Sequence, residues 1–158
     1  MEGKESPKVS GTSDIAGKMV RIRHAGEADM GFIEEQLRKN NMDAESLDFR
    51  EFLVAAEDGE ITGFGRMKKT GQFYQVGCVV VVEEKRSKGI GSLIVKHMME
   101  LAPVTLVYIP VELEEYFTKL GFERMKEGSK ELFDALDDAC KVKGKPNTAI
   151  MVHEKPAF

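Results

Sequence analysis

The sequence has few cysteines and no excess of positive charge. Its 158 residues contain two cysteines, Cys78 and Cys140, which are far apart and not at metal-ligand spacing. Neither a disulfide framework nor a zinc site is therefore indicated. The formal net charge is −4, which gives no reason to expect binding to nucleic acid. We expect a reducing, cytoplasmic location and no bound metal.

Long apolar segments are also absent. The longest uninterrupted aliphatic run covers residues 79–82, which is too short to span a bilayer. The first residues contain no apolar core of signal-peptide length, so we expect no membrane partner. Hydrophobic residues make up 42% of the chain and charged residues 32%, a composition typical of one soluble globular domain with a single core.

The first part of the chain divides into a polar lead-in and the start of a domain. Residues 1–18 have little to bury and predict a disordered or loosely ordered segment, so the domain is expected over residues 19–158. Residues 19–24 predict a strand, and residues 27–39 predict a helix because apolar residues recur at three-to-four spacing. Asn40 and Asn41 are expected to end that helix.

The middle of the chain alternates strand and helix signals. Asp58 and Gly59 predict a hairpin turn between strands 51–57 and 60–68, because both positions tolerate positive φ. The remaining predicted elements are a strand at 72–82, a helix at 91–101, a strand at 104–109, a helix at 113–120 ending at Gly121, and short strands at 122–125 and 148–154. Residues 129–139 predict a further helix and residues 143–147 a loop. This order indicates a mixed sheet with helices on both faces.

Residues 86–92, Arg-Ser-Lys-Gly-Ile-Gly-Ser, join the apolar strand 76–82 directly to an amphipathic helix. Two glycines separated by one residue let the backbone approach a ligand closely, and the first N–H groups of the helix can bind an anion. A Rossmann fingerprint or a P-loop would need further glycines or a Gly-Lys-Ser/Thr sequence, and neither fits. The segment predicts a phosphate site, and the alternative is a plain strand–helix turn with solvated basic residues.

The segment resembles the acetyl-CoA-binding motif of the GNAT superfamily of N-acetyltransferases, Arg/Gln-x-x-Gly-x-Gly/Ala, which Arg86, Gly89 and Gly91 match. Residues 116–122 resemble the second GNAT signature, aromatic-x-x-x-Gly-Phe. The resemblance covers roughly residues 20–125. It implies an α/β (α+β) fold with a mixed, mostly antiparallel central sheet, splayed parallel strands and helices on both faces. Residues 75–78, 116–122 and 148–154 look like the amino-acid N-acetyltransferase branch, which includes N-acetylglutamate synthase-like domains.

The resemblance implies that acetyl-CoA lies between strands 72–82 and 104–109. Backbone groups of Val79 and Val81 would hydrogen-bond its pantetheine arm, and the N–H groups that follow would hold its pyrophosphate. The expected cofactor-binding residues are Val79, Val80, Val81, Arg86, Ser87, Lys88, Gly89, Ile90, Gly91 and Ser92. For residues 79–82, a role as a buried core strand is equally compatible with the sequence.

The catalytic positions depart from the family pattern. Many members carry glutamate where this chain has Gln75. An amide cannot act as a base, so Gln75 would orient a water or the acceptor, or serve only the structure. The usual tyrosine position holds Phe117, which leaves Tyr108 and Tyr116 as candidate proton donors, each of which is otherwise an aromatic at the core edge. The departing thiolate, with a thiol pKa near 8.5, is not difficult to release without a protein acid.

The expected acceptor is the primary amine of a small molecule, an amino acid above all. Arg23 and Arg66 would bind its carboxylate, unless they are ordinary surface arginines. Two other functions remain open, a protein or peptide N-acetyltransferase and a non-catalytic acyl-CoA-binding module. Exposed edge strands would allow a homodimer.

Overall fold

The computed structural model of the chain describes residues 11–15, 18–42, 44–70, 73–125 and 148–155. Its sheet has eight strands in the order β1-β2-β3-β4-β5-β6-β8-β7. Neighbouring strands are antiparallel except β5 and β6, which are parallel. The predicted α/β fold with a mixed, mostly antiparallel sheet is therefore confirmed. The predicted helix 129–139 and loop 143–147 lie outside the described residues.

The elements agree closely with the sequence prediction. The strands are β1 (Gly11–Ile15), β2 (Lys18–His24), β3 (Phe52–Glu57), β4 (Glu60–Thr70), β5 (Phe73–Val81), β6 (Val104–Pro110), β7 (Glu123–Arg124) and β8 (Thr148–Glu154). The helices are α1 (Met30–Lys39), α2 (Ile90–Leu101) and α3 (Glu114–Lys119), with short 3-10 helices η1 (Glu27–Asp29), η2 (Phe49–Glu51), η3 (Glu83–Lys85) and η4 (Val111–Leu113). The predicted helix 91–101 and strand 104–109 each differ from α2 and β6 by one residue at one end.

Strand β1 is the element that the sequence did not predict. Residues 11–15 were expected to belong to a loosely ordered lead-in, but they pair with β2 in an antiparallel register from Gly11↔Ile22 to Ile15↔Lys18. The segment is short and polar, so it lacks the alternating apolar pattern that indicates a half-buried strand. Its pairing to the backbone of β2 is what places it at the edge of the sheet.

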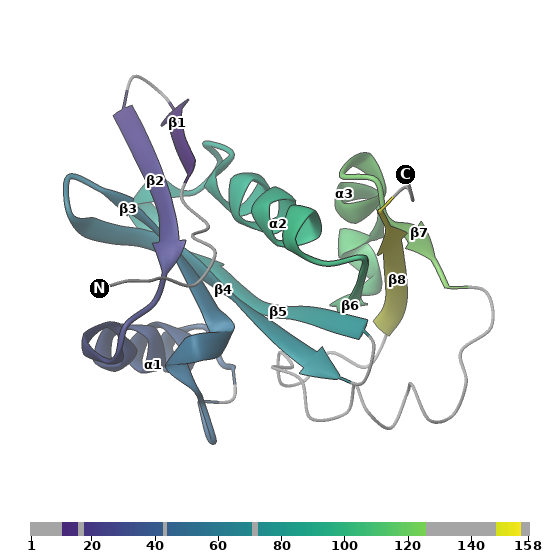
Figure 1. Cartoon of the computed structure of the whole chain (residues 1–158), viewed down its shortest axis with the longest axis horizontal. Coiled ribbons are helices and arrows are strands. Elements are labelled where there is room, and N and C mark those ends of the chain that lie inside the picture. The colour runs from purple at the N-terminus through teal and green to yellow at the C-terminus, as the bar shows by residue number, and fades with distance from the viewer. Residues whose placement is uncertain (1–10, 16–17, 43, 71–72, 126–147, 156–158) are drawn as a thin grey trace, which may run out of the picture.

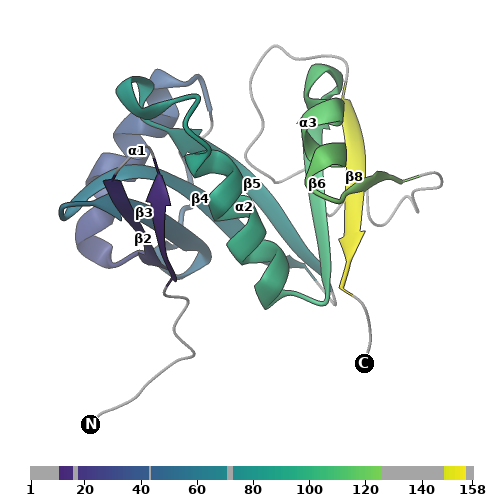
Figure 2. The same ribbon diagram turned by 90° about the horizontal axis from the view of Figure 1, so that it is seen from above.

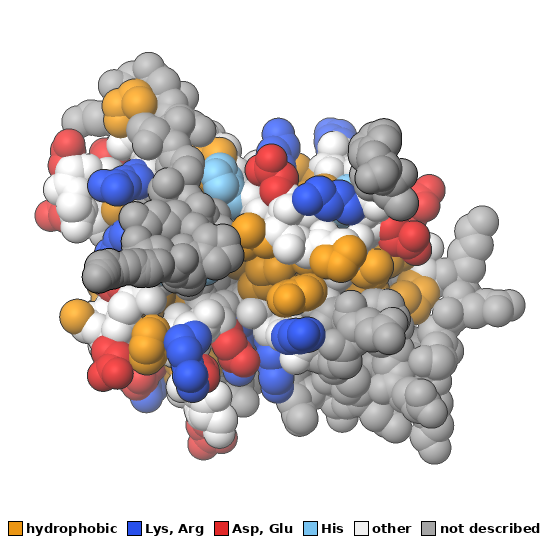
Figure 3. All heavy atoms as spheres, viewed as in Figure 1, with side chains coloured by type: hydrophobic (Ala, Val, Ile, Leu, Met, Phe, Trp, Pro, Cys, Tyr) orange, Lys and Arg blue, Asp and Glu red, His pale blue; other side chains and the backbone are white. Residues whose placement is uncertain are grey.

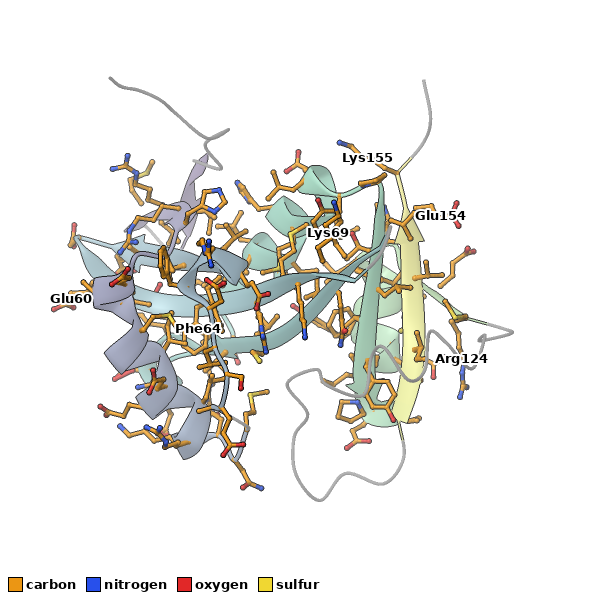
Figure 4. The ribbon with its side chains drawn as sticks, turned by 60° about the horizontal axis from the view of Figure 1, so that its bottom comes forward. Glu60, Phe64, Lys69, Arg124, Glu154 and Lys155 are labelled. Atoms are coloured by element: carbon orange, nitrogen blue, oxygen red, sulfur yellow. The ribbon has the colours of Figure 1, made fainter. Side chains whose placement is uncertain are left out.

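Helices α1 and α2 lie on opposite faces of the sheet (Figure 1). Ile94 and Met98 of α2 pack on the sheet with Val76 and Val107. The second core cluster lies on the α1 face and includes Ile33, Leu37, Phe52, Phe64, Cys78 and Val80. Figure 4 shows Phe64 within the structure between sheet and helix. Burying one such side chain contributes roughly 1.5–3 kcal/mol, so these two clusters fix both helices on the sheet.

Two glycines in β4 let α2 approach the sheet closely. A Cβ on Gly65 would lie 2.8 Å from Cε of Met98, and a Cβ on Gly63 would lie 3.3 Å from Cδ1 of Ile94. Both distances are shorter than ordinary carbon–carbon contacts. The helix that follows the glycine-rich loop is thereby held directly above β4.

The predicted hairpin turn and the predicted end of the first helix are confirmed. Asp58 and Gly59 have φ values of 52° and 81°, the two positive angles that a type I′ hairpin turn requires. Helix α1 ends at Asn40, and Asn41 has a φ of 58°. The N–H of Met42 donates to the carbonyl of Leu37 at 2.8 Å, which is the bond pattern of a Schellman cap.

The parallel strands β5 and β6 separate along their length. Their register covers only Tyr74↔Thr105 to Val76↔Val107, although β5 continues to Val81 and β6 to Pro110. Figure 2 shows the two strands close together at one end and diverging toward the other. We call the space between the unpaired parts of β5 and β6 the opening.

A β-bulge lies where the opening begins. On β4, Phe64 pairs with Val80 and Arg66 pairs with Gly77, so two residues of β5 face one residue of β4. Cys78 has a φ of 50° there, an uncommon angle for a residue with a side chain. A bulge of this kind bends its strand and increases the twist, which separates β5 from β6.

The closed end of the two strands lies on the side of the molecule seen in Figure 1. Figure 3 shows hydrophobic side chains near the middle of this side, where the end of α2 meets the sheet, and Leu101 at that helix end is 42% exposed. The carbonyl of Glu100 accepts a hydrogen bond of 2.7 Å from Nζ of Lys155, which satisfies one of the last carbonyls of the helix.

Among the described residues, no helix is long and apolar enough to cross a membrane.

Candidate active site

The backbone of β5 presents hydrogen-bonding groups to the opening. The N–H of Val82 donates to the carbonyl of Thr62 on the neighbouring strand at 2.9 Å. Successive N–H groups of a strand point to opposite sides, so the N–H groups of Val79 and Val81 point away from β4 and toward the opening. Their side chains pack against the α2 core, whereas Val80 packs on the α1 face.

The loop after β5 ends in a helix N-terminus without a side-chain cap. Gly89 is the N-cap residue with a φ of 88°, a left-handed angle that favours glycine. No acidic residue lies in the first turn of α2, so nothing there repels an anion. The first intrahelical bond runs from the N–H of Leu93 to the carbonyl of Gly89, which leaves the N–H groups of residues 90–92 directed outward.

The basic residues of the loop have different partners. Arg86 donates from Nε to the carbonyl of Val81 at 2.8 Å and from its other end to Oδ1 of Asn40 at 3.0 Å. Lys85 forms an ion pair with Glu57 at 2.7 Å, and this hydrogen bond raises the pKa of Lys85. Lys88 is exposed, as is Ser87. Arg86 therefore joins the loop to α1 and β5, and Lys88 is the exposed cation beside the helix N-terminus.

Tyr116 reaches the same loop from α3. Its hydroxyl lies 2.7 Å from Oγ of Ser92, and a Cβ on Gly91 would lie 3.6 Å from that hydroxyl and 3.7 Å from Cγ2 of Val81. Tyr116 thus lies beside the first turn of α2 at the wide end of the opening. Its neighbour Phe117 is buried in the α2 core against Phe122, with ring centroids 5.5 Å apart.

The opposite side of the sheet carries polar groups near the opening. Gln75 is only 3% exposed, and neither its Nε2 nor its Oε1 has a hydrogen-bond partner. Because Val76 faces α2, the neighbouring Gln75 faces the other side of the sheet. Arg66 pairs with Gly77 on that side, and Tyr108 packs with the Leu106 cluster there. A buried amide without a partner is costly, and it marks this surface as a place for a polar ligand.

The two predicted acceptor arginines lie in different places. Arg66 is 9% exposed and forms an ion pair of 2.7 Å with Glu51. Arg23 forms an ion pair of 2.9 Å with Asp29 at the start of α1. The registers Arg23↔Val54, Val54↔Phe64 and Phe64↔Val80 place Arg23 three strands, or about 14 Å, from β5. The structure brings Arg66, Gln75 and Tyr108 to one side of the opening and does not bring Arg23 there.

The two candidate proton donors are also separated. Tyr108 lies with Leu106 on the face away from α2, whereas Tyr116 lies against Phe117 on the α2 side. They approach the opening from opposite faces of the sheet. Their roles as acids remain predictions.

The expectation for the cysteines is wrong in part. Cys78, at the bulge beside the opening, is disulfide-bonded. Cys140 lies outside the described residues. Sequence spacing alone does not establish a disulfide. In the described part of the chain, no group of three or more His, Cys, Asp or Glu side chains is placed to hold a metal.

Sequence reasoning missed Lys68. It pairs with Gln75 across β4 and β5, and opposite residues of an antiparallel pair share a face. The alternation Arg66-Met67-Lys68 was a usable signal, because it places two cations on one face and an apolar side chain on the other.

Comparison with known proteins gives the family. Residues 48–124 match the acetyltransferase (GNAT) domain. No curated protein matches the sequence. Many solved structures share the fold, and their sequence identities to this chain are low. At such identities the likeness establishes the fold and not the substrate.

Three solved structures illustrate the range of similar proteins. N-acetylglutamate synthase from Neisseria gonorrhoeae, complexed with coenzyme A and L-arginine, is 18% identical with a TM-score of 0.69, covering 87% of this chain and 34% of that one. The chain thus spans about a third of that enzyme. Rv2747 from Mycobacterium tuberculosis, complexed with CoA, is 17% identical with a TM-score of 0.68, covering 85% and 99%. The ribosomal-protein-S18-alanine N-acetyltransferase from Escherichia coli is 10% identical with a TM-score of 0.64, covering 89% and 96%.

Proposed function

This chain is a member of the GNAT acetyltransferase superfamily, and we propose that it transfers the acetyl group of acetyl-CoA directly to the primary amine of a small molecule, an amino acid. The observation that carries this proposal is the polar surface opposite α2, where the buried amide of Gln75 lies near Arg66. A cationic side chain beside an unpartnered amide suits an acceptor that carries a carboxylate.

The residues around the opening fit coenzyme A. When bound, acetyl-CoA supplies a thioester carbonyl that is open to attack by an amine. The N–H groups of Val79 and Val81 point into the opening and would hold the extended pantetheine arm as an added strand. The outward N–H groups of residues 90–92, with Lys88, would hold the pyrophosphate. Gly91 leaves room between Val81 and Tyr116 for this approach.

The acceptor would enter from the face away from α2. An alkyl amine has a pKa of about 10 and is mostly protonated at neutral pH, so a proton must leave before the C–N bond forms. Gln75 cannot take that proton, but its Oε1 can accept a hydrogen bond from a water that carries the proton to solvent. The C–S bond then breaks, and a thiol with a pKa near 8.5 needs no acid from Tyr108 or Tyr116.

The test is a product screen by mass spectrometry. The protein is incubated with acetyl-CoA and separate panels of free amino acids, the same amino acids as amides, polyamines and N-terminal peptides. We expect acetylation of one or more free amino acids. Acetylated peptides with unmodified amino acids would indicate a peptide acetyltransferase instead, and tight acetyl-CoA binding without product would indicate a non-catalytic acyl-CoA-binding module.

A pair of variants tests the contribution of Arg66. Arg66→Lys keeps the charge but loses the fork that binds a carboxylate at two points, so the acceptor KM should rise while the affinity for acetyl-CoA stays constant. Glu51→Gln is the control, because it removes the partner of Arg66 without removing the cation. If both variants change only the thermal stability, Arg66 serves the fold and not the acceptor.

A further inference from the structure

Lys68 has a position that the proposed function does not use. It lies directly opposite Gln75 in the register of β4 and β5, so their Cβ atoms are about 5 Å apart on the same face. Met67 packs into the α2 core, which places its neighbour Lys68 on the other side of the sheet. Lys68, Gln75 and Arg66 therefore form one polar group on the face away from α2, at the level where β5 is still paired with β6 and just before the opening begins.

The charges on this surface are unequally paired. Arg66 is already neutralised by Glu51 at 2.7 Å. Lys68 is half-buried, and within the described part of the chain it has neither a hydrogen bond nor an ion pair. Partial burial weakens the hydration of an ammonium group, so an anion there gains more than it would in free solution. Lys68 is thus a second cation on this face, beside Arg66, and it is available to a ligand.

The buried amide beside Lys68 is the second observation. Gln75 is 3% exposed, and both Nε2 and Oε1 lack a partner. A carboxylate accepts hydrogen bonds at two oxygens. Nζ of Lys68 and Nε2 of Gln75 supply two donors from adjacent strands, and Oε1 remains to accept from a water or from the amine.

We infer that Lys68, together with the amide of Gln75, binds the carboxylate of the acceptor and selects a free amino acid over the corresponding amide or simple amine. This inference rests on the proposed function. It makes Lys68 a specificity-determining residue, because its contact is with the carboxylate and not with the reacting amine.

The chain offers a matched control at the next residue. Lys69 is exposed and pairs with Tyr74. It is two residues from Met67 on the same strand, so its side chain points to the same face, the α2 side of the sheet. Figure 4 shows Lys69 on the side of α2, at the end of β4. Removing either lysine changes the net charge by the same amount. Because only Lys68 shares a face with Gln75, only its removal should affect acceptor choice.

The experiment compares an amino acid that the wild-type protein acetylates with the amide of the same amino acid. The variants are Lys68→Met, Lys68→Arg and Lys69→Met, and kcat/KM is measured for both acceptors alongside the dissociation constant of acetyl-CoA. Methionine keeps the apolar stem of the lysine. Circular dichroism and thermal melts show whether each variant is folded.

We expect Lys68→Met to lower kcat/KM for the free amino acid by about 10-fold to 100-fold, the range for a hydrogen bond between charged groups. Activity on the amide and the affinity for acetyl-CoA should remain within about twofold. Lys68→Arg should retain most of the preference for the acid, and Lys69→Met should match the wild type.

Two outcomes would overturn the inference. An equal loss on acid and amide in Lys68→Met would show that Lys68 affects the fold or the chemistry rather than selectivity. An unchanged preference for the acid in a folded Lys68→Met would show that another residue binds the carboxylate. Failure of the wild type to acetylate any free amino acid is a different result, since it removes the proposed function itself.

Discussion

The two sides of the opening are built on different principles. On the α2 side, Val79 and Val81 bury their side chains and leave their backbone N–H groups to the opening, and the helix N-terminus likewise offers backbone groups. On the other side, Arg66, Lys68 and Gln75 present side chains. Backbone groups bind a ligand that is common to a whole family, whereas side chains select one acceptor. The division explains why this fold combines a constant cofactor with variable acceptors.

The largest effect is expected when a negative charge is placed among the backbone groups that would bind acetyl-CoA. Gly91→Asp puts a carboxylate in the first turn of α2, where no acidic residue now lies. The charge should stabilise the helix by about 0.3–1 kcal/mol through the dipole. It should also weaken acetyl-CoA binding about 100-fold, because like charges about 5 Å apart repel by roughly 3 kcal/mol. Thermal melts and calorimetric titration with acetyl-CoA measure the two opposite effects.

Gly31→Asp is the matched control for that variant. Gly31 is the second residue of α1, as Gly91 is of α2, and a Cβ on Gly31 would meet no atom within 4 Å. It should leave the affinity for acetyl-CoA unchanged. If Gly91→Asp also leaves it unchanged, the pyrophosphate does not bind at the N-terminus of α2.

The corresponding change on the side-chain surface is Gln75→Leu. Replacing a buried amide that has no partner by an apolar group of similar size should raise the free energy of unfolding by about 1–3 kcal/mol. Acetyl transfer should fall about 10-fold, because the water or acceptor loses its hydrogen bond, while acetyl-CoA binds as before. Urea unfolding, steady-state kinetics and titration give the three values. A variant that is more stable and fully active would restrict Gln75 to a structural role.

The same division decides what the sequence predicts. The motif around Gly89 and Gly91 is local, so spacing alone places it between a strand and a helix, and the GNAT resemblance follows. The acceptor side depends on pairing between strands. The bulge at Cys78 changes which residues of β5 share a face with Arg66, and no local pattern reveals it. Lys68 lies outside the bulge, and the local alternation Arg66-Met67-Lys68 does indicate its face. The sequence places Arg23 in a strand but does not show that three strands separate it from the opening.

A smaller effect on acetyl-CoA affinity is expected from Arg86, which joins the loop after β5 to α1. Arg86 bonds both to the carbonyl of Val81 and to Asn40 at the end of α1. Arg86→Ala removes both bonds and should weaken acetyl-CoA binding about 10-fold, since a hydrogen bond to a charged group contributes about 1.5 kcal/mol or more. Asn40→Ala removes the contact of Arg86 with α1 and the hydrogen bond from Nδ2 of Asn40 to the carbonyl of Gln36, leaves the bond from Arg86 to Val81, and should cost about threefold or less. Equal losses in the two titrations would mean that the loop depends on α1 rather than on β5.

The smallest effect concerns Arg23, far from the opening. The hydrogen bond from Arg23 holds the pKa of Asp29 below its ordinary value, so the folded protein binds this proton more weakly than the unfolded chain. The resulting stability is present above the unfolded pKa of about 3.9 and is lost as the pH falls below it. Asp29→Asn should therefore be less stable than the wild type at pH 7, and the difference should shrink toward pH 3. Thermal melts across this range test it.

Asp48→Asn provides the comparison for that pair, because the exposed Asp48 is also held at a lowered pKa by Arg50 but is screened by solvent. Its effect on melting should be the weaker of the two at every pH. Acetylation kinetics test whether Arg23 contributes to acceptor binding. Because Arg23 bonds to Asp29 at the start of α1 and to the carbonyl of His24, far from the opening, the acceptor KM of Asp29→Asn should equal that of the wild type. A higher KM would mean that the acceptor surface extends from β4 and β5 across the sheet to β2. The side chains that select the acceptor would then not be limited to the strands beside the opening.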